Sequence, residues 1–159
     1  MELENKLKGI IFGLFGSIIA SLATSLSVSL LISDHWTILL SGLIVGVSSS
    51  FANSFGPLVS SAQMLNQRRY STKDFEQSIA SSMLTFIIIS LPLVPYALIG
   101  NLDLSRIISI TTGLVLLFIF GVHRAQLEYD GSPLKYGLSI SIFGAMIVSL
   151  CYYLVYYFK

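Results

Sequence analysis

Charge is what this sequence has least of. Of its 159 residues, 54% are hydrophobic and only 11% are charged, and the mean hydropathy is +0.81. A soluble domain carries about 25% charged residues, so we expect an integral membrane protein instead. Lys and Arg exceed Asp and Glu by a net charge of +1, which gives no electrostatic basis for binding nucleic acid.

Cysteine is almost absent too. Cys151 stands alone, which excludes an intramolecular disulfide and a multi-cysteine metal site. The long apolar stretches contain no Asp, Glu, Lys, Arg or His, the groups that metal ligation, acid–base catalysis or proton relay inside a bilayer would need. His35 and His123 fall in different connections and are not expected to form one site; Asp34 and His35 are expected to form a helix-capping turn. We therefore expect neither an enzyme nor a bound cofactor.

Long apolar stretches are what the sequence has in abundance. A helix needs about 20 apolar residues to cross the hydrocarbon layer, and five stretches between the charged residues reach or approach that length. No stretch alternates apolar and polar residues as the strands of a membrane barrel do. The sequence therefore predicts an all-α, multi-pass membrane protein with a single transmembrane domain over residues 1–159. Its five helices are expected at about 9–33, 36–66, 77–100, 104–123 and 136–158.

The basic residues are distributed unevenly between the connections. With a cytoplasmic N-terminus, the outer side holds only Arg106 and Lys159, and the inner side holds Lys6, Lys8, Arg68, Arg69, Lys73, Arg124 and Lys135. Short cytoplasmic loops are enriched in Lys and Arg, so the bias predicts an N-in, C-out orientation, in the cell membrane if the source is prokaryotic. The first apolar run is longer than that of a cleavable signal peptide and is expected to stay in the mature protein.

A small residue recurs at every fourth position of the first span. The stripe consists of Gly9, Gly13, Ser17, Ser21, Ser25, Ser29 and Ser33. Residues four apart share one helix face, and small residues let another backbone approach while their hydroxyls bond across the interface. The stripe is either a packing seam, with Gly9 to Ser25 as candidates for a dimer contact, or a hydroxyl-lined path. Both interpretations place this helix at the centre of the protein.

The second span is the most polar one. Ser49, Asn53, Pro57 and Ser61 lie four apart on one face. Proline leaves a backbone carbonyl without its helical donor, and in lipid that carbonyl needs another partner. We therefore expect this face to be buried in protein or to face water. In the third span, Pro92 and Pro95 predict a bend.

Several short motifs, taken in order, resemble the vacuolar iron transporter family. Residues 10–17, IIFGLFGS, are similar to the family's first-helix run I-I-F-G-L-V-D-G. Residues 42–61 align without gaps on G-L-x-x-x-x-A-D/E-G-F-S-M-G-x-G-x-Y-x-S-S, and residues 92–96, PLVPY, on P-L-x-P-Y. Residues 112–114 with Gly121, and residues 137–138 with Gly144, look like its last two helices.

The resemblance implies a five-helix bundle that forms a homodimer and moves Fe²⁺ or Mn²⁺. Helices one and two of each subunit would line the path at the two-fold axis, with Gly16, Ser17, Ser49, Asn53 and Pro57 as the path residues of this chain. Candidate ligands for the transported ion are Ser49, Asn53 and Met64.

The chain departs from the family pattern at its charged positions. The family's first-helix acid falls on Gly16, its second-helix acid on Ser49 and its second-helix methionine on Asn53. A divalent ion without counter-charge in a low-dielectric layer is costly. Three hypotheses therefore stay open: transport of Fe²⁺ or Mn²⁺, a transporter or channel for another small solute, and a non-transporting membrane protein that assembles or binds partners.

Overall fold

The computed structural model describes residues 2–64, 72–128 and 132–159, and these residues contain helices and no strand. In chain order the elements are α1 (Glu2–Leu31), α2 (His35–Met64), α3 (Thr72–Ser90), the 3₁₀ turn η1 (Leu91–Leu93), α4 (Val94–Leu98), α5 (Leu102–Glu128) and α6 (Pro133–Phe158). The all-α fold expected from the sequence is therefore present.

Four of the described helices are long and apolar enough to cross a membrane. The qualifying segments are Gly13–Leu31, His35–Ala52, Leu102–Gln126 and Pro133–Phe158. They correspond to four of the five expected spans, although α1, α5 and α6 begin earlier than expected. Glu, Lys and Gln are good helix formers, so a helix can continue past the apolar segment that marks it in the sequence.

The third expected span, 77–100, is interrupted. Its apolar part is the shorter segment Ser82–Leu98, which passes from α3 through η1 into α4. Pro92 and Pro95 lack a backbone donor, and each disfavours helical geometry in the residue before it. The bend expected from these prolines is present, and it divides this pass into two helices.

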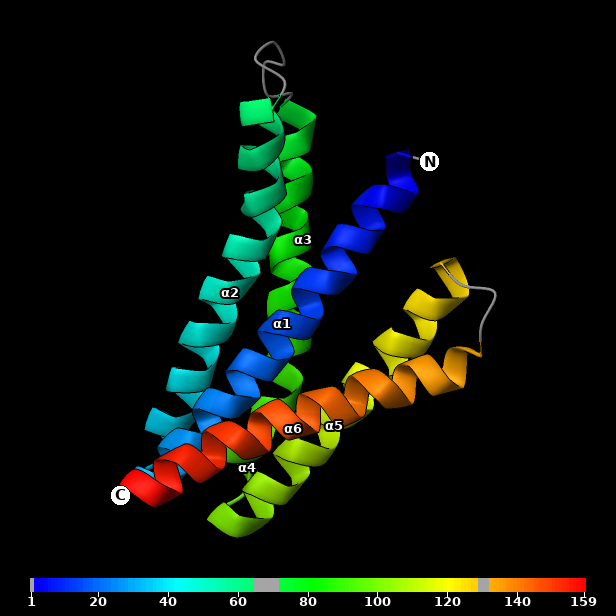
Figure 1. Cartoon of the computed structure of the whole chain (residues 1–159). Helices are drawn as coiled ribbons and strands as arrows, with labels where there is room; N and C mark the ends of the chain where they lie inside the picture. Colours follow the sequence, from blue (N-terminus) through cyan, green and yellow to red (C-terminus); the bar gives the residue numbers. More distant parts are fainter. Residues whose placement is uncertain (1, 65–71, 129–131) are drawn as a thin grey trace.

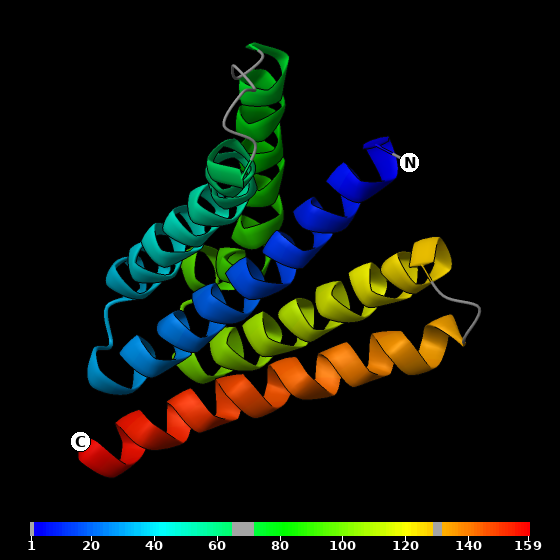
Figure 2. The ribbon, with the colours of Figure 1, turned by 45° about the horizontal axis from the view of Figure 1, so that its top comes forward.

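Two helix pairs enclose α1. Figure 1 shows α2 beside α3 and α5 beside α6, with α1 passing between the pairs; Figure 2 shows α1, α5 and α6 as one layer from which α2 and α3 rise. The main core joins Ile18 and Leu22 of α1 to Ile89 of α3, Leu117 of α5 and Val148 of α6. Half of the α1 span is buried, against 28% or less of the other three, so helix one is central, as the stripe predicted.

The helix ends gather at two ends of the bundle. The N-terminus and the ends of α2 and α5 point one way, and the end of α1, α4 and the C-terminus lie opposite (Figure 1, Figure 2). We call these the N-terminal end and the C-terminal end of the bundle.

The turn between α1 and α2 lies at the C-terminal end and is capped by a carboxylate. The Thr37 hydroxyl and the Thr37 amide both donate to Asp34 Oδ2, the amide at 2.8 Å. These two hydrogen bonds, the hydroxyl's first, lower the pKa of the exposed Asp34 carboxyl. Asp34 therefore caps the start of α2, as the sequence predicted.

Candidate functional site

From Ser17 to Ser29 the serine stripe of α1 is buried inside the single chain, whereas Ser33, its last predicted member, lies beyond the end of α1 and is exposed. Ser17, Ser21 and Ser25 are 0% exposed and Ser29 is 3% exposed. Ser17, Ser25 and Ser29 donate to carbonyls of their own helix, at 2.8, 3.1 and 2.7 Å. Ser21 donates instead to the Gly42 carbonyl of α2, at 2.9 Å. Because the hydroxyl protons have acceptors, the stripe can pack in an apolar interior.

Two glycines of α2 allow this close contact. A Cβ placed on Gly42 would lie 3.1 Å from Ser25 Cβ and 2.9 Å from a Leu93 methyl group, and one on Gly46 would lie 3.4 Å from Ser21 Cβ. In the single chain, the partner of the stripe at Ser21 and Ser25 is therefore α2. Since Ser21 and Ser25 are fully buried against α2, neither can contact a second copy of the chain unless α2 moves away.

The remaining seam candidates lie toward the N-terminal end. Gly13 is buried. The surroundings of Gly9 lie outside the described part of the structure, although its backbone belongs to α1.

The contacts between α1 and α2 set the relative depth of the predicted path residues. Ser25 meets Gly42 and Ser21 meets Gly46, so continuing this antiparallel register by four residues places Ser17 level with Ser50. Gly16 and Ser49 then differ in depth by about two residues, or about 3 Å along the axis. Two candidates separated by 33 positions in the sequence, 49 less 16, therefore come to nearly the same level.

The path candidates differ in exposure. Gly16 is exposed, Ser49 is half-buried and Ser17 is fully buried. Asn53, Pro57 and Met64 belong to α2, but their side chains lie outside the described part of the structure. Nothing in the described geometry therefore bears on Ser49, Asn53 and Met64 as a set of metal ligands.

Acidic, cysteine and histidine side chains do not cluster in the described ranges. No group of three or more His, Cys, Asp or Glu that could hold a metal ion occurs there. His35 starts α2, and its Nδ1 lies 3.2 Å from the Tyr96 carbonyl. Since a carbonyl only accepts, Nδ1 carries the proton. His123 lies in α5, toward the opposite end of the bundle from His35 (Figure 1), so the two are apart, as expected, although both belong to helices and not to the connections predicted from the sequence.

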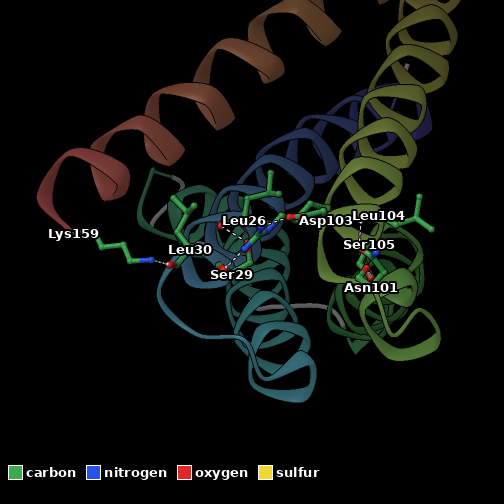
Figure 3. A network of polar contacts seen from close by, with 9 residues as sticks. Leu26, Ser29, Leu30, Asn101, Asp103, Leu104, Ser105 and Lys159 are labelled. Atoms are coloured by element: carbon green, nitrogen blue, oxygen red, sulfur yellow. Dashed lines mark hydrogen bonds and ion pairs between the residues drawn. The ribbon is translucent and has the colours of Figure 1, made fainter.

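A second polar site, at the C-terminal end of the bundle, was not predicted from the sequence. Arg106 of α5 reaches across to the last turns of α1, where its Nε donates to Ser29 Oγ at 2.8 Å and its Nη2 donates to the Ser29 carbonyl. Its Nη1 donates to Asp103 Oδ1 at 2.6 Å. Lys159 donates from the C-terminus to the Leu30 carbonyl at 2.5 Å, and Figure 3 shows this contact beside Ser29 and Asp103.

These contacts give Arg106 and Lys159 a structural role. The last four carbonyls of a helix lack intrahelical donors, and cations are favourable there because they complement the helix dipole. Arg106 and Lys159 bond to two successive carbonyls, Ser29 and Leu30, near the end of α1. The sequence signal was an arginine close to the start of an apolar run; its partner 77 positions away could not be inferred from it.

Replacing Arg106 with methionine is expected to destabilise the protein. The variant keeps the apolar stem and loses the hydrogen bonds to Ser29. A hydrogen bond from a charged donor is worth about 1.5–3 kcal/mol, so this loss should lower the free energy of unfolding. Lys159→Met is the matched control, because the Lys159 contact is exposed and worth at most about 1 kcal/mol. Thermal unfolding in detergent measures both variants. Equal midpoints for the two would contradict the role given to Arg106.

Near Arg106 lies a group of buried hydroxyls from three helices. Tyr96 of α4 is 1% exposed, and its hydroxyl lies near Ser109 of α5 and near Ser25 and Ser29 of α1, with the Arg106 guanidinium beyond. We call these five residues the Tyr96 cluster. Ser105 is also 0% exposed, and its hydroxyl donates toward the Asn101 carbonyl at 2.9 Å (Figure 3) and toward the Pro95 carbonyl of α4 at 3.2 Å, so it joins α5 to α4.

Comparisons with known proteins return no match: neither a family model, nor a curated protein, nor a solved structure is similar to this chain.

Proposed function

We propose that this chain is a multi-pass membrane transport protein that works as a homodimer and carries a divalent cation, Fe²⁺ or Mn²⁺, along helices α1 and α2. The observation that carries the proposal is the position of Gly16 and Ser49. They lie at nearly the same depth, and both remain at least partly exposed on the single chain while the serine stripe beside them is buried.

Exposed polar groups on α2 support a second copy. Only 22% of the His35–Ala52 span is buried in the chain, and its surface includes exposed Ser48 and half-buried Ser49. Polar groups at membrane depth need protein or water around them. A second copy that covers this face would enclose a polar path between two α2 helices.

The charge distribution supports the proposed orientation. Arg124 and Lys135 lie near the N-terminal end of the bundle, on α5 and α6, and Lys6 and Lys8 lie on the first turns of α1. The described cations at the opposite end, Arg106 and Lys159, bond to the last carbonyls of α1. This distribution follows the positive-inside rule with a cytoplasmic N-terminus.

Metal flux into vesicles tests the proposal. The protein is reconstituted into liposomes that contain a metal-sensing dye, and uptake of Fe²⁺ and Mn²⁺ is measured. We expect uptake well above that of empty vesicles and at least a tenfold loss for Asn53→Leu, because the substitution removes an oxygen ligand of the kind these ions prefer. Ser139→Leu, a change on the exposed surface of α6, should transport normally. No uptake above empty vesicles would reject the proposal.

A small uncharged solute is the second candidate cargo. The observation in its favour is that, after His35 and Trp36 at the start of α2, the described polar side chains within the spans of α1 and α2 are hydroxyls, with no acidic side chain among residues 13–31 and 35–52. Hydroxyls can replace the hydrogen bonds of a neutral solute but cannot neutralise a divalent ion. A screen by thermal shift separates the candidates, because only a bound substrate raises stability by mass action.

A further inference from the structure

One face of α6 is exposed along most of the helix. Four large apolar side chains on it, spaced four residues apart, are between 54% and 64% exposed: Leu138, Ile142, Met146 and Leu150. We call these four residues the α6 row. Residues four apart share one helix face. Three strongly exposed tyrosines continue this face to the C-terminal end of the bundle: Tyr153, Tyr156 and Tyr157.

This face points away from the rest of the chain. Gly137, Gly144 and Val148 are the buried residues of α6, and at 3.6 residues per turn their centre lies about 150° around the helix from that of the three tyrosines. Membrane helices meet one another through small residues. A Cβ on Gly137 would lie 2.6 Å from Val122, and one on Gly144 would lie 2.5 Å from Leu117, so these two glycines already meet α5.

The uncharged length of α6 fits a bilayer. Lys135 and Lys159 enclose residues 136–158, which carry no charge. At 1.5 Å per residue this segment is about 35 Å long, against about 30 Å of hydrocarbon. Met146 lies near its middle, and Tyr157 lies about 16 Å further along the axis. Tyr157 is therefore near the level at which the hydrocarbon ends.

We propose that this face of α6 docks on the lipid bilayer, with the α6 row against the acyl chains and the rings of Tyr153, Tyr156 and Tyr157 among the head groups. A tyrosine ring has an apolar body and a hydroxyl that needs a polar partner, and such rings gather at membrane surfaces. The strongly exposed Trp36, at the start of the α2 span, lies at the same end of the bundle (Figure 1).

The composition of the face favours lipid over water or a second copy. In water the α6 row would be an apolar patch of the kind that soluble proteins avoid. The second copy proposed above is assigned to α2, where Ser48 and Ser49 are at least partly exposed. Ser139, which flanks the row, donates to the Lys135 carbonyl of its own helix at 2.9 Å. The inference rests on the membrane setting of the proposed function, but on neither its cargo nor its dimer.

Fluorescence quenching at two depths tests the proposal. Trp36 is the only tryptophan, so in a Trp36→Phe background an introduced tryptophan is the sole reporter. Met146→Trp and Tyr157→Trp are reconstituted in phosphatidylcholine brominated either near the head group or near the ends of the acyl chains. We expect the shallow bromine to quench Tyr157→Trp about twice as strongly as Met146→Trp, and the deep bromine to reverse the order, because interfacial rings lie at head-group level.

Gly100→Trp is the matched control. Gly100 is exposed in the connection between α4 and α5, and a Cβ there has nothing within 4 Å. We expect aqueous iodide to quench this variant more strongly than either lipid does.

Three results would overturn the proposal. Quenching of Met146→Trp by iodide and by neither lipid would place the face in water. Quenching by none of these reagents would place it under a second copy. Equal depths for Met146→Trp and Tyr157→Trp would separate the tyrosines from the head groups. A failure of metal uptake changes none of these results, so this proposal and the proposed function fail separately.

Photolabelling of the unmodified protein is a second test that needs no variant. A lipid-soluble carbene reagent is activated in the vesicles, and the labelled residues are mapped by mass spectrometry. We expect label on the α6 row. An α6 without label in a protein whose α5 is labelled would overturn the proposal.

Discussion

Gly137→Leu is expected to abolish stable packing of α6 on α5. A Cβ on Gly137 would lie 2.9 Å from the Phe118 carbonyl oxygen and 2.6 Å from a Val122 methyl group, and one on Gly121 would lie 2.8 Å from Gly137 Cα. Because the Phe118 oxygen is a backbone atom, a rotated side chain cannot relieve that contact of the Gly137 variant. The helices must therefore separate. Because only 11% of the α6 span is buried, this crossing is central to its packing.

The cost of this substitution should be at the upper end for overpacking, about 3 kcal/mol or more, out of a total stability of about 5–15 kcal/mol. We expect a large fall in the thermal unfolding midpoint and in the yield of monodisperse protein. Gly100→Leu is the matched control, since a Cβ on Gly100 has nothing within 4 Å. A Gly137→Leu variant as stable as the Gly100→Leu variant would show that the helices do not cross this closely.

Flexible neighbours should make a different glycine more tolerant. A Cβ on Gly113 would lie 2.2 Å from a Leu22 methyl group, which is formally closer than any contact of Gly137. That contact lies at the end of a side chain that can change rotamer, whereas the Phe118 carbonyl is fixed in α5. The chemical identity of the neighbour, more than the distance, therefore ranks the two glycines.

Span positions could be predicted because apolar length is a property of the local sequence. The gaps between charged residues located α1, α2, α5 and α6, and two prolines located the bend before α4. The helix ends were less predictable. Hydrogen bonding along the backbone continues a helix through polar residues, so α1 already begins at Glu2 and α5 extends to Glu128.

The candidate sites were less accessible to sequence reasoning. A four-residue period shows that the face of Ser21 and Ser25 exists, but it does not say which helix covers it. The signal for the answer was the matching period of Gly42 and Gly46, which the structure places against them. The Tyr96 cluster combines residues from α1, α4 and α5, and no local pattern records a contact that depends on how three helices pack.

Ser21→Leu distinguishes the two locations considered for the serine stripe. At a dimer axis, a leucine would separate two copies and leave each subunit folded. In the structure Ser21 is 0% exposed and donates to the Gly42 carbonyl at 2.9 Å, so the larger side chain has to push α1 away from α2 of the same chain. The variant also loses a hydrogen bond worth about 1 kcal/mol, and the strain adds about 1–3 kcal/mol.

We therefore expect Ser21→Leu to lower the unfolding midpoint of the subunit itself, whatever its oligomeric state. Ser139→Leu is the matched control: Ser139 is exposed on α6, away from the face assigned to the second copy, and its hydroxyl bonds to the Lys135 carbonyl of its own helix, at 2.9 Å. Thermal unfolding and particle mass are measured together for both variants. A Ser21→Leu protein that dissociates with an unchanged midpoint would place the stripe between copies. A lowered midpoint would place it inside the chain and leave the Gly16 and Ser49 face for the second subunit.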